Sequence, residues 1–220
     1  MIVKFEDEKM KKKYIILILL TNFALQNNIS SMVSNGLEKD SYVNKAKTSQ
    51  MAKILNKHNI DMKDWKKIID LINGGADINT KSNDGNTALI RAVINHDIGM
   101  IKFLISKKAN VNSENNDGKT ALLLAVYYRY KDVIGLLLDA GADINAKDSI
   151  NEDTPLRLAV LLSETGANYR DIISFLISKG ASVNIKDEYG LDILTWAKMT
   201  NASKDILDLL HGSNKKSNNK

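Results

Sequence analysis

Apolar residues gather along this chain in short runs that recur in pairs. The runs "TALIRAV", residues 87–93, and "TALLLAV", residues 120–126, each begin with Thr and lie 33 positions apart. A polar break and a second apolar run, such as "DVIGLLLDAG" from Asp132, follow the first. Because each run suffices for a short helix and turn residues precede it, the pattern predicts two helices and a hairpin-like turn per unit.

The ends of the units repeat as well. The segments "GGADINTK", "KANVNSE", "GADINAK" and "GASVNIK" place Ala76, Ala109, Ala142 and Ala181 at intervals of 33, 33 and 39 residues. A fixed period in this range is typical of a solenoid, whose units must stack because one unit cannot bury its apolar faces alone. The residues expected between stacked units are Ala92, Ala125, Ala159 and Ala197 on the first helices and Leu104, Leu137 and Leu176 on the second.

Polar and glycine residues fix where the helices begin and end. Thr87, Thr120 and Thr154 stand at predicted helix starts, where a side-chain oxygen accepts from free backbone N–H groups. Gly141 follows a second helix, where a left-handed residue ends the helix without a Cβ penalty. Lys108 stands at the corresponding place one unit earlier, and a left-handed turn there should cost about 1 kcal/mol.

The repeated segments resemble the ankyrin repeat family. The segments "NDGNTALIRA", "NDGKTALLLA" and "EDTPLRLA", with the unit endings above, match several fixed positions of that family over roughly residues 48–211. The resemblance implies an all-α ankyrin-repeat solenoid of paired antiparallel helices and β-hairpin-like turns, with about four to five repeats including degenerate caps. The His that the family places after Leu is replaced by Ile90, Leu123, Arg157 and Thr195.

Three segments are expected along the chain. Residues 1–40 form a signal-like or flexible segment, residues 41–212 the repeat domain, and residues 213–220 a polar, basic, disordered tail. The N-terminal cap has its first helix near "SQMAKILNKH", residues 49–58, without the Thr signature of the other units. In the unit before the last, about five extra residues between the two helices should form a longer loop.

The N-terminal segment has the features of an export signal. Lys11, Lys12 and Lys13 precede an apolar run from Tyr14 to Leu20, which is much shorter than the roughly 20 apolar residues of a membrane span. We therefore expect export to the periplasm or outside the cell, with cleavage between Ala24 and Ser34, and no stable membrane span. The alternative is a buried helix of a cytoplasmic protein.

Charge favours a protein partner over nucleic acid. The net charge of +5 divides into +3 over residues 1–50, −1 over 51–210 and +3 over 211–220. A phosphate-binding face needs Lys and Arg gathered on the folded domain, whereas here the excess is terminal. The alternative function is a binder that uses its basic ends on nucleic acid or an anionic membrane surface.

No pattern in the chain indicates catalysis. The 220 residues contain no cysteine, and the three histidines lack metal-ligand spacing. Gly118-Lys119-Thr120 resembles the end of a phosphate-binding loop, but Ser113 occupies the position of the loop's first glycine. We expect no enzyme activity, cofactor, metal or small-molecule substrate.

The resemblance to ankyrin repeats implies a concave surface of hairpin tips and first helices that grips a protein. Tyr127 and Tyr128 stand out there, because aromatic side chains are enriched among binding hot spots. The alternative is that one of them packs against the next unit. The other predicted contacts are Tyr189, Asn86, Lys119 and Asn95, while Asn83, Asp84, Asn116 and Asp117 are turn residues first and Ile94 and Met199 packing residues first. The tyrosine pair is expected beside the hairpins, and the inserted loop, Thr165 to Asn168, at the far end of the helices.

Overall fold

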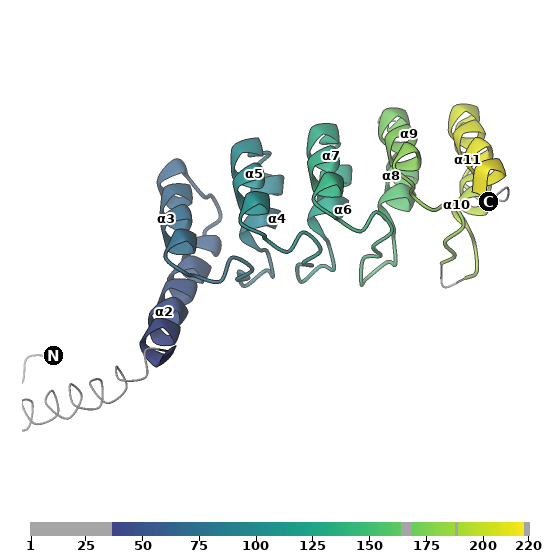
Figure 1. Cartoon of the computed structure of the whole chain (residues 1–220). Coiled ribbons are helices and arrows are strands. Elements are labelled where there is room, and N and C mark those ends of the chain that lie inside the picture. The colour runs from purple at the N-terminus through teal and green to yellow at the C-terminus, as the bar shows by residue number, and fades with distance from the viewer. Residues whose placement is uncertain (1–36, 164–168, 188, 218–220) are drawn as a thin grey trace, which may run out of the picture.

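Five helix pairs stand in a row in the computed structural model of this chain, which describes residues 37–163, 169–187 and 189–217 (Figure 1). Within those residues there are ten helices and no strands, as the sequence predicts. Units one to five are the pairs α2 (Leu37–Leu55) with α3 (Met62–Asn73), α4 (Ala88–Ile94) with α5 (Ile98–Ser106), α6 (Ala121–Tyr127) with α7 (Lys131–Asp139), α8 (Pro155–Ser163) with α9 (Arg170–Ser178), and α10 (Ile193–Met199) with α11 (Lys204–Ser217). The loops between units project together from one side of the row (Figure 1).

One continuous apolar core runs through the stack. The alanines predicted between first helices, Ala92, Ala125, Ala159 and Ala197, are fully buried, and α4, α6, α8 and α10 contact one another in sequence. The predicted leucines, Leu104, Leu137 and Leu176, are also fully buried. Small residues allow the first helices to approach closely, and the leucines fill the space between units, so both predictions are confirmed.

The predicted helix caps are present. The Thr87 hydroxyl accepts from the N–H of Ile90 at 3.3 Å, and the Thr120 hydroxyl accepts from the N–H of Leu123 at 3.2 Å. Thr154 accepts from the N–H of Arg157 at 3.2 Å. In unit five Asp192 has this role, with 2.7 Å to the N–H of Thr195. The first helices of units two to five therefore begin at the positions that the repeat period assigns to them.

Left-handed residues end the second helices. Gly141 has a φ of 89° and Gly180 a φ of 96°, and Lys108 keeps the left-handed turn with a φ of 64°. The lysine Cβ is strained in this conformation, whereas glycine adopts it freely.

Lys108→Gly should therefore raise the free energy of unfolding by about 0.5 to 1 kcal/mol. Part of the relief is offset by the greater freedom of glycine in the unfolded chain. Chemical denaturation measures the change. Lys107→Gly is the control, because the φ of Lys107 is −86°, and it should destabilise instead.

Asparagine side chains connect each hairpin base to the next. Asn79 Oδ1 accepts from the N–H of Asn110 at 2.8 Å, Asn112 from Asp143 at 2.9 Å, and Asn145 from Ser182 at 2.9 Å. Within the described residues the hairpin-like turns contain a single isolated β-bridge, between Glu114 and Thr120. Hydrogen bonds from these side chains therefore align each hairpin with the next, as the strands of a continuous sheet would otherwise do.

The predicted segment limits, after residues 40 and 212, both fall inside helices, α2 and α11. Helix α2 begins at Leu37 and is longer than the expected helix near residues 49–58. Helix α11 continues to Ser217, so the backbone of residues 213–217 is helical where a disordered tail was expected. The signal-like run at residues 10–25, the inserted residues 164–168 and the last residues, 218–220, lie outside the described part. Among the described helices, none is long and apolar enough to cross a bilayer.

Candidate protein-binding surface

The hairpins of units three, four and five are built by one local rule. A buried or partly buried side chain, Asn115, Asp148 or Asp187, accepts from the backbone N–H of the residue two positions later. The three donors are Asp117, Ile150 and Tyr189, at 3.0, 3.0 and 2.9 Å respectively. These donors occupy equivalent positions at the hairpin tips, and all three side chains are exposed, Ile150 by 63% and Tyr189 by 77%.

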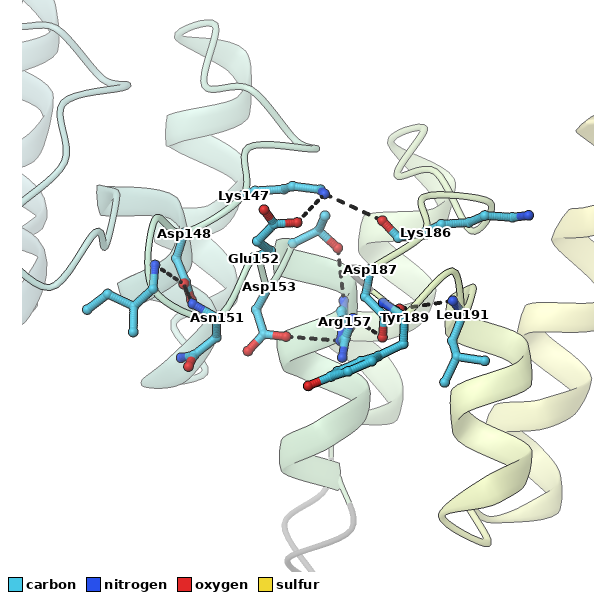
Figure 2. A network of polar contacts seen from close by, with 12 residues as sticks. Lys147, Asp148, Asn151, Glu152, Asp153, Arg157, Lys186, Asp187, Tyr189 and Leu191 are labelled. Carbon is cyan, nitrogen blue, oxygen red and sulfur yellow. Dashed lines mark hydrogen bonds and ion pairs between the residues drawn. The ribbon is translucent and has the colours of Figure 1, made fainter.

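An ion-pair network holds the last two of these hairpins (Figure 2). Arg157 lies between two carboxylates, with Nε 3.0 Å from Asp153 and Nη1 3.0 Å from Asp187 in the next unit. Lys147 pairs with Glu152 at 2.8 Å and also donates to the carbonyl of Lys186. The network therefore joins unit four to unit five, and it uses the position where the family has His.

A second buried pair joins unit three to unit four. Lys119 Nζ lies 2.6 Å from Asp148, whose side chain is fully buried. Burial acts to raise the pKa of Asp148, but the bond from Lys119 and the N–H groups of Asn151 and Ile150 hold this pKa below its ordinary value. Asp148 therefore stays ionised at neutral pH and pairs with its lysine.

The two acids beside Arg157 differ in their titration. Burial raises the pKa of Asp153 above its ordinary value, although the charge of Arg157 acts against this. Hydrogen bonds from the N–H groups of Leu191 and Tyr189, and from Arg157, hold the pKa of Asp187 below its ordinary value. Arg157, Asp153 and Asp187 pair with one another, so their role is to hold the hairpins in place.

A second row of side chains lies in the last turn of the first helices. The seventh residue after each helix cap is Ile94, Tyr127, Leu161 or Met199. Ile94 is half-buried, while Tyr127, Leu161 and Met199 are exposed by 54%, 36% and 68%. In every unit from two to five this position is therefore apolar, and in the last three it is open to a partner.

Both rows lie on the same side of the solenoid. Arg91, four residues after its helix cap, reaches the tip residue Asp84 at 3.5 Å. Positions four and seven residues after a cap lie on one face of a helix, so the row of seventh residues shares the face that turns toward the hairpins. A helix of seven residues rises about 10 Å, so the row of seventh residues lies about that far from the helix caps, and the tip row lies on the other side of the caps.

We call this side the front surface and define it by the exposed apolar side chains of the two rows, together with Tyr128, which contacts Tyr127. They are Tyr127, Tyr128, Ile150, Leu161, Tyr189 and Met199. The structure leaves nine large hydrophobic side chains exposed in the described residues, and six of them belong to this surface. Such clustering, unlike scattered apolar residues, indicates an interaction site.

The tyrosine pair belongs to an aromatic cluster of His96, Tyr127, Tyr128 and Tyr130. Tyr130 stacks on His96 at 4.0 Å between ring centroids and on Tyr128 at 5.4 Å, and Tyr127 meets Tyr128 edge to face at 5.2 Å. Mutual contact already restricts the motion of these rings. Their side chains would therefore lose little conformational entropy when a partner binds.

The predicted contact residues fall into two groups. Tyr127, Tyr128 and Tyr189 are exposed on the front surface, and Asn95 is exposed at the end of α4. Asn86 is buried and accepts from the amide of Asn115 at 3.1 Å, and Lys119 pairs with Asp148. Asn86 and Lys119 connect neighbouring units, so little of either side chain is left for a partner.

The expected place of the tyrosine pair beside the hairpins is wrong, whereas the expected place of the inserted loop falls on residues 164–168, outside the described part. The hydroxyl of Tyr169, the residue that directly follows the inserted residues 164–168, donates to the carbonyl of Tyr127 at 2.7 Å. Tyr127 is the last residue of α6, whose other end carries Thr120 and the hairpin, so the tyrosine lies at the far end of the helix. Tyr169 is itself buried, which raises the pKa of its phenol.

The sequence analysis missed Ile150 and Leu161 as surface residues. A signal was present, because Leu161 is at the same distance from its helix cap as Tyr127 and Met199. The equivalence of Ile150 with Tyr189 was hidden by the extra residue in the hairpin of unit four, and only the shared hydrogen bond reveals it.

The hollow beside the Arg157 network has little space for a small ligand. A pocket beside Arg157, Asp187 and Ile193 has a volume of about 10 Å³, room for a single water molecule at most. Among the described residues, no three His, Cys, Asp or Glu side chains group as a metal site would require. The surface is suited to contact over area rather than enclosure.

Comparison with known proteins agrees with the repeat geometry. A family model for ankyrin repeats in three copies matches residues 63–148, and a model for a single ankyrin repeat matches residues 151–188. No curated protein matches the chain.

Proposed function

This chain belongs to the ankyrin repeat family, whose repeats are generally protein–protein interaction modules, and from that membership we propose that it binds a protein partner through the front surface. Binding is non-covalent and involves no catalysis by this chain. The observation that carries the proposal is the concentration of exposed apolar side chains on this one side of the stack.

The front surface has the composition of a binding hot spot. Tyr127, Tyr128 and Tyr189 supply large, amphipathic contact area with few rotatable bonds. The aromatic cluster is held in place by its own ring contacts and, at Tyr127, by the backbone bond from Tyr169. When side chains are ordered before binding, association costs less conformational entropy.

The experiment is photo-crosslinking in the native cell from single positions. A photoreactive residue replaces Tyr127 or Tyr189 in one pair of variants and Met62 in the control, which is 81% exposed on α3. We expect a discrete protein adduct from positions 127 and 189 and none from 62. Adducts to nucleic acid or lipid, or no protein adduct from the front positions, would overturn the proposal.

Loss of one front tyrosine should weaken binding to the partner found in this way. Tyr127→Ala removes a hot-spot side chain and should cost about 2 kcal/mol, near thirtyfold in Kd. Tyr42→Ala is the matched control, because Tyr42 is 66% exposed on α2 in unit one, outside the units that carry the front surface, and its Kd should change by less than twofold. Calorimetry gives both values, and equal losses in the two variants would contradict the assignment.

A further inference from the structure

The two rows of the front surface change character along the stack. The tip residues are Asp84 and Asp117 in units two and three but Ile150 and Tyr189 in units four and five. In the row at the helix ends, exposure begins at Tyr127 and continues to Met199. The apolar part of the front surface is therefore confined to units three to five.

The hairpins beside these apolar residues are acidic. Over residues 112–120, 143–154 and 182–192, the described acids are Glu114, Asp117, Asp143, Asp148, Glu152, Asp153, Asp187 and Asp192, and the lysines are Lys119, Lys147 and Lys186. With Arg157 on the adjoining helix, eight carboxylates face four cations, in a chain whose net charge is +5. The negative charge is therefore a local property of these three hairpins.

Several of these carboxylates are available to an incoming cation. In the described part of the chain, Glu114, Asp117, Asp143 and Asp192 make no ion pair, whereas Asp148, Glu152, Asp153 and Asp187 are paired internally. Glu114, Asp117 and Asp143 lie in the hairpins of units three and four, whereas Asp192 in unit five already caps α10. A partner with positive charges at matching intervals would be attracted to these carboxylates and an acidic partner repelled.

We propose that units three to five bind a basic, amphipathic helix of the partner protein, an inference that rests on the function proposed above. The helix-end row lies about 10 Å along each first helix from its cap, and the tip row lies beyond the cap, which leaves room between the rows for an α-helix about 10 Å wide. Such a helix lies along the stack between the rows. Its apolar side chains contact Tyr127, Leu161 and Met199 on one side and Ile150 and Tyr189 on the other, and its Lys and Arg side chains face the acidic hairpins.

The repeat also sets the spacing of the partner's apolar residues. Packed helices lie about 10 Å apart, so successive units present equivalent residues at about that interval. An α-helix rises the same distance in about seven residues, which is close to two turns. Apolar residues at positions i, i+7 and i+14 of the partner therefore meet the three units in turn. The pocket beside Arg157 and its two carboxylate partners has a volume of only about 10 Å³. The helix therefore rests on this surface without inserting a side chain there.

The experiment uses the full chain and three synthetic helical peptides as probes. The first has leucine on one face and lysine elsewhere, the second replaces every lysine with glutamate, and the third keeps the lysines but replaces every leucine with serine. Calorimetry should give micromolar binding for the Lys/Leu peptide and at least tenfold weaker binding for the other two. Equal binding of the Glu/Leu peptide would overturn the charge assignment, and equal binding of the Lys/Ser peptide would overturn the apolar one.

Matched variants locate the site. Met199→Ala and Tyr189→Ala should each weaken the Lys/Leu peptide about tenfold, while Met62→Ala and Tyr42→Ala, of similar exposure, should change it less than twofold. Asp117→Asn should reduce the salt dependence of binding, and Asp70→Asn on α3 should leave it unchanged. The inference is overturned if the α2 and α3 variants weaken binding and the front variants do not. If no peptide binds while photo-crosslinking still captures a protein from positions 127 and 189, this inference fails and the proposed function stands.

Discussion

Leu137→Ala should lower the free energy of unfolding by about 2 to 5 kcal/mol. Leu137 is fully buried on α7, in the central unit of the stack, where its side chain fills the space between neighbouring units. Truncation removes apolar contacts on both sides and leaves a cavity that rigid helices close only in part. Chemical denaturation followed by circular dichroism measures the loss.

Leu210→Ala is the matched control for this prediction. Leu210 is also fully buried, but it lies on α11 in the last unit, which has a neighbour on one side only. In a stack, stability is a sum of unit and neighbour terms, so this loss should be smaller and should loosen the end unit alone. Equal losses at the two positions would contradict a stability carried by contacts between neighbouring units.

Arg157→Met should destabilise the protein by roughly 3 kcal/mol, toward the lower end of the range for breaking a buried ion pair, because a fifth of the arginine side chain is exposed. The variant keeps much of the side-chain length but leaves the buried carboxylates of Asp153 and Asp187 without their cation. The ion pair between units four and five, from Arg157 to Asp187, is lost with it.

The pH dependence of this variant follows from Asp153. Burial raises its pKa already in the presence of Arg157, and removing the arginine raises this pKa further. A carboxyl group with a higher pKa in the folded state favours folding at low pH, and that stabilisation disappears as the pH rises through the folded pKa. The loss caused by Arg157→Met should therefore be smaller at about pH 5 than at about pH 8.

Arg170→Met serves as the control for the arginine prediction. Arg170 is 3.9 Å from Asp205, and both side chains are more than half exposed. An exposed pair of this kind contributes less than about 1 kcal/mol, with little change over the same pH range. Equal destabilisation of the Arg157 and Arg170 variants would refute the assignment of Arg157 as a bridge between units.

Much of the fold could be predicted because its determinants are local. A threonine that caps a helix accepts from an N–H three residues away, and a residue that ends a helix does so through its own φ. The conformations of Thr120, Gly141 and Lys108 could therefore be predicted without knowing which residues contact them in the fold. The repeat period then placed Ala125 and Leu137 between units. Both kinds of signal survive in a single sequence.

The site could be predicted only in part, because its side chains pair across units. Asn86 was expected at a contact surface, but its partner Asn115 lies 29 residues away, as does Asp148 from Lys119. The bond from Tyr169 to Tyr127 spans 42 residues and crosses the inserted segment. No local pattern indicates which side chain of one hairpin meets which of the next. Tyr127, Tyr128 and Tyr189 were predicted as exposed because aromatic residues stood at positions that the repeat leaves open.

The most direct test of the front surface is a footprint of the bound partner on this chain. Hydroxyl-radical oxidation compares side chains of one type on the front surface and in unit one: Tyr189 with Tyr42, and Met199 with Met62, all of them more than 60% exposed. With the crosslinked partner added in excess, Tyr189 and Met199 should be protected, together with Tyr127 and Tyr128, while Tyr42 and Met62 react as before. Protection of Tyr42 and Met62 with unchanged oxidation of Tyr189 and Met199 would contradict binding at the front surface.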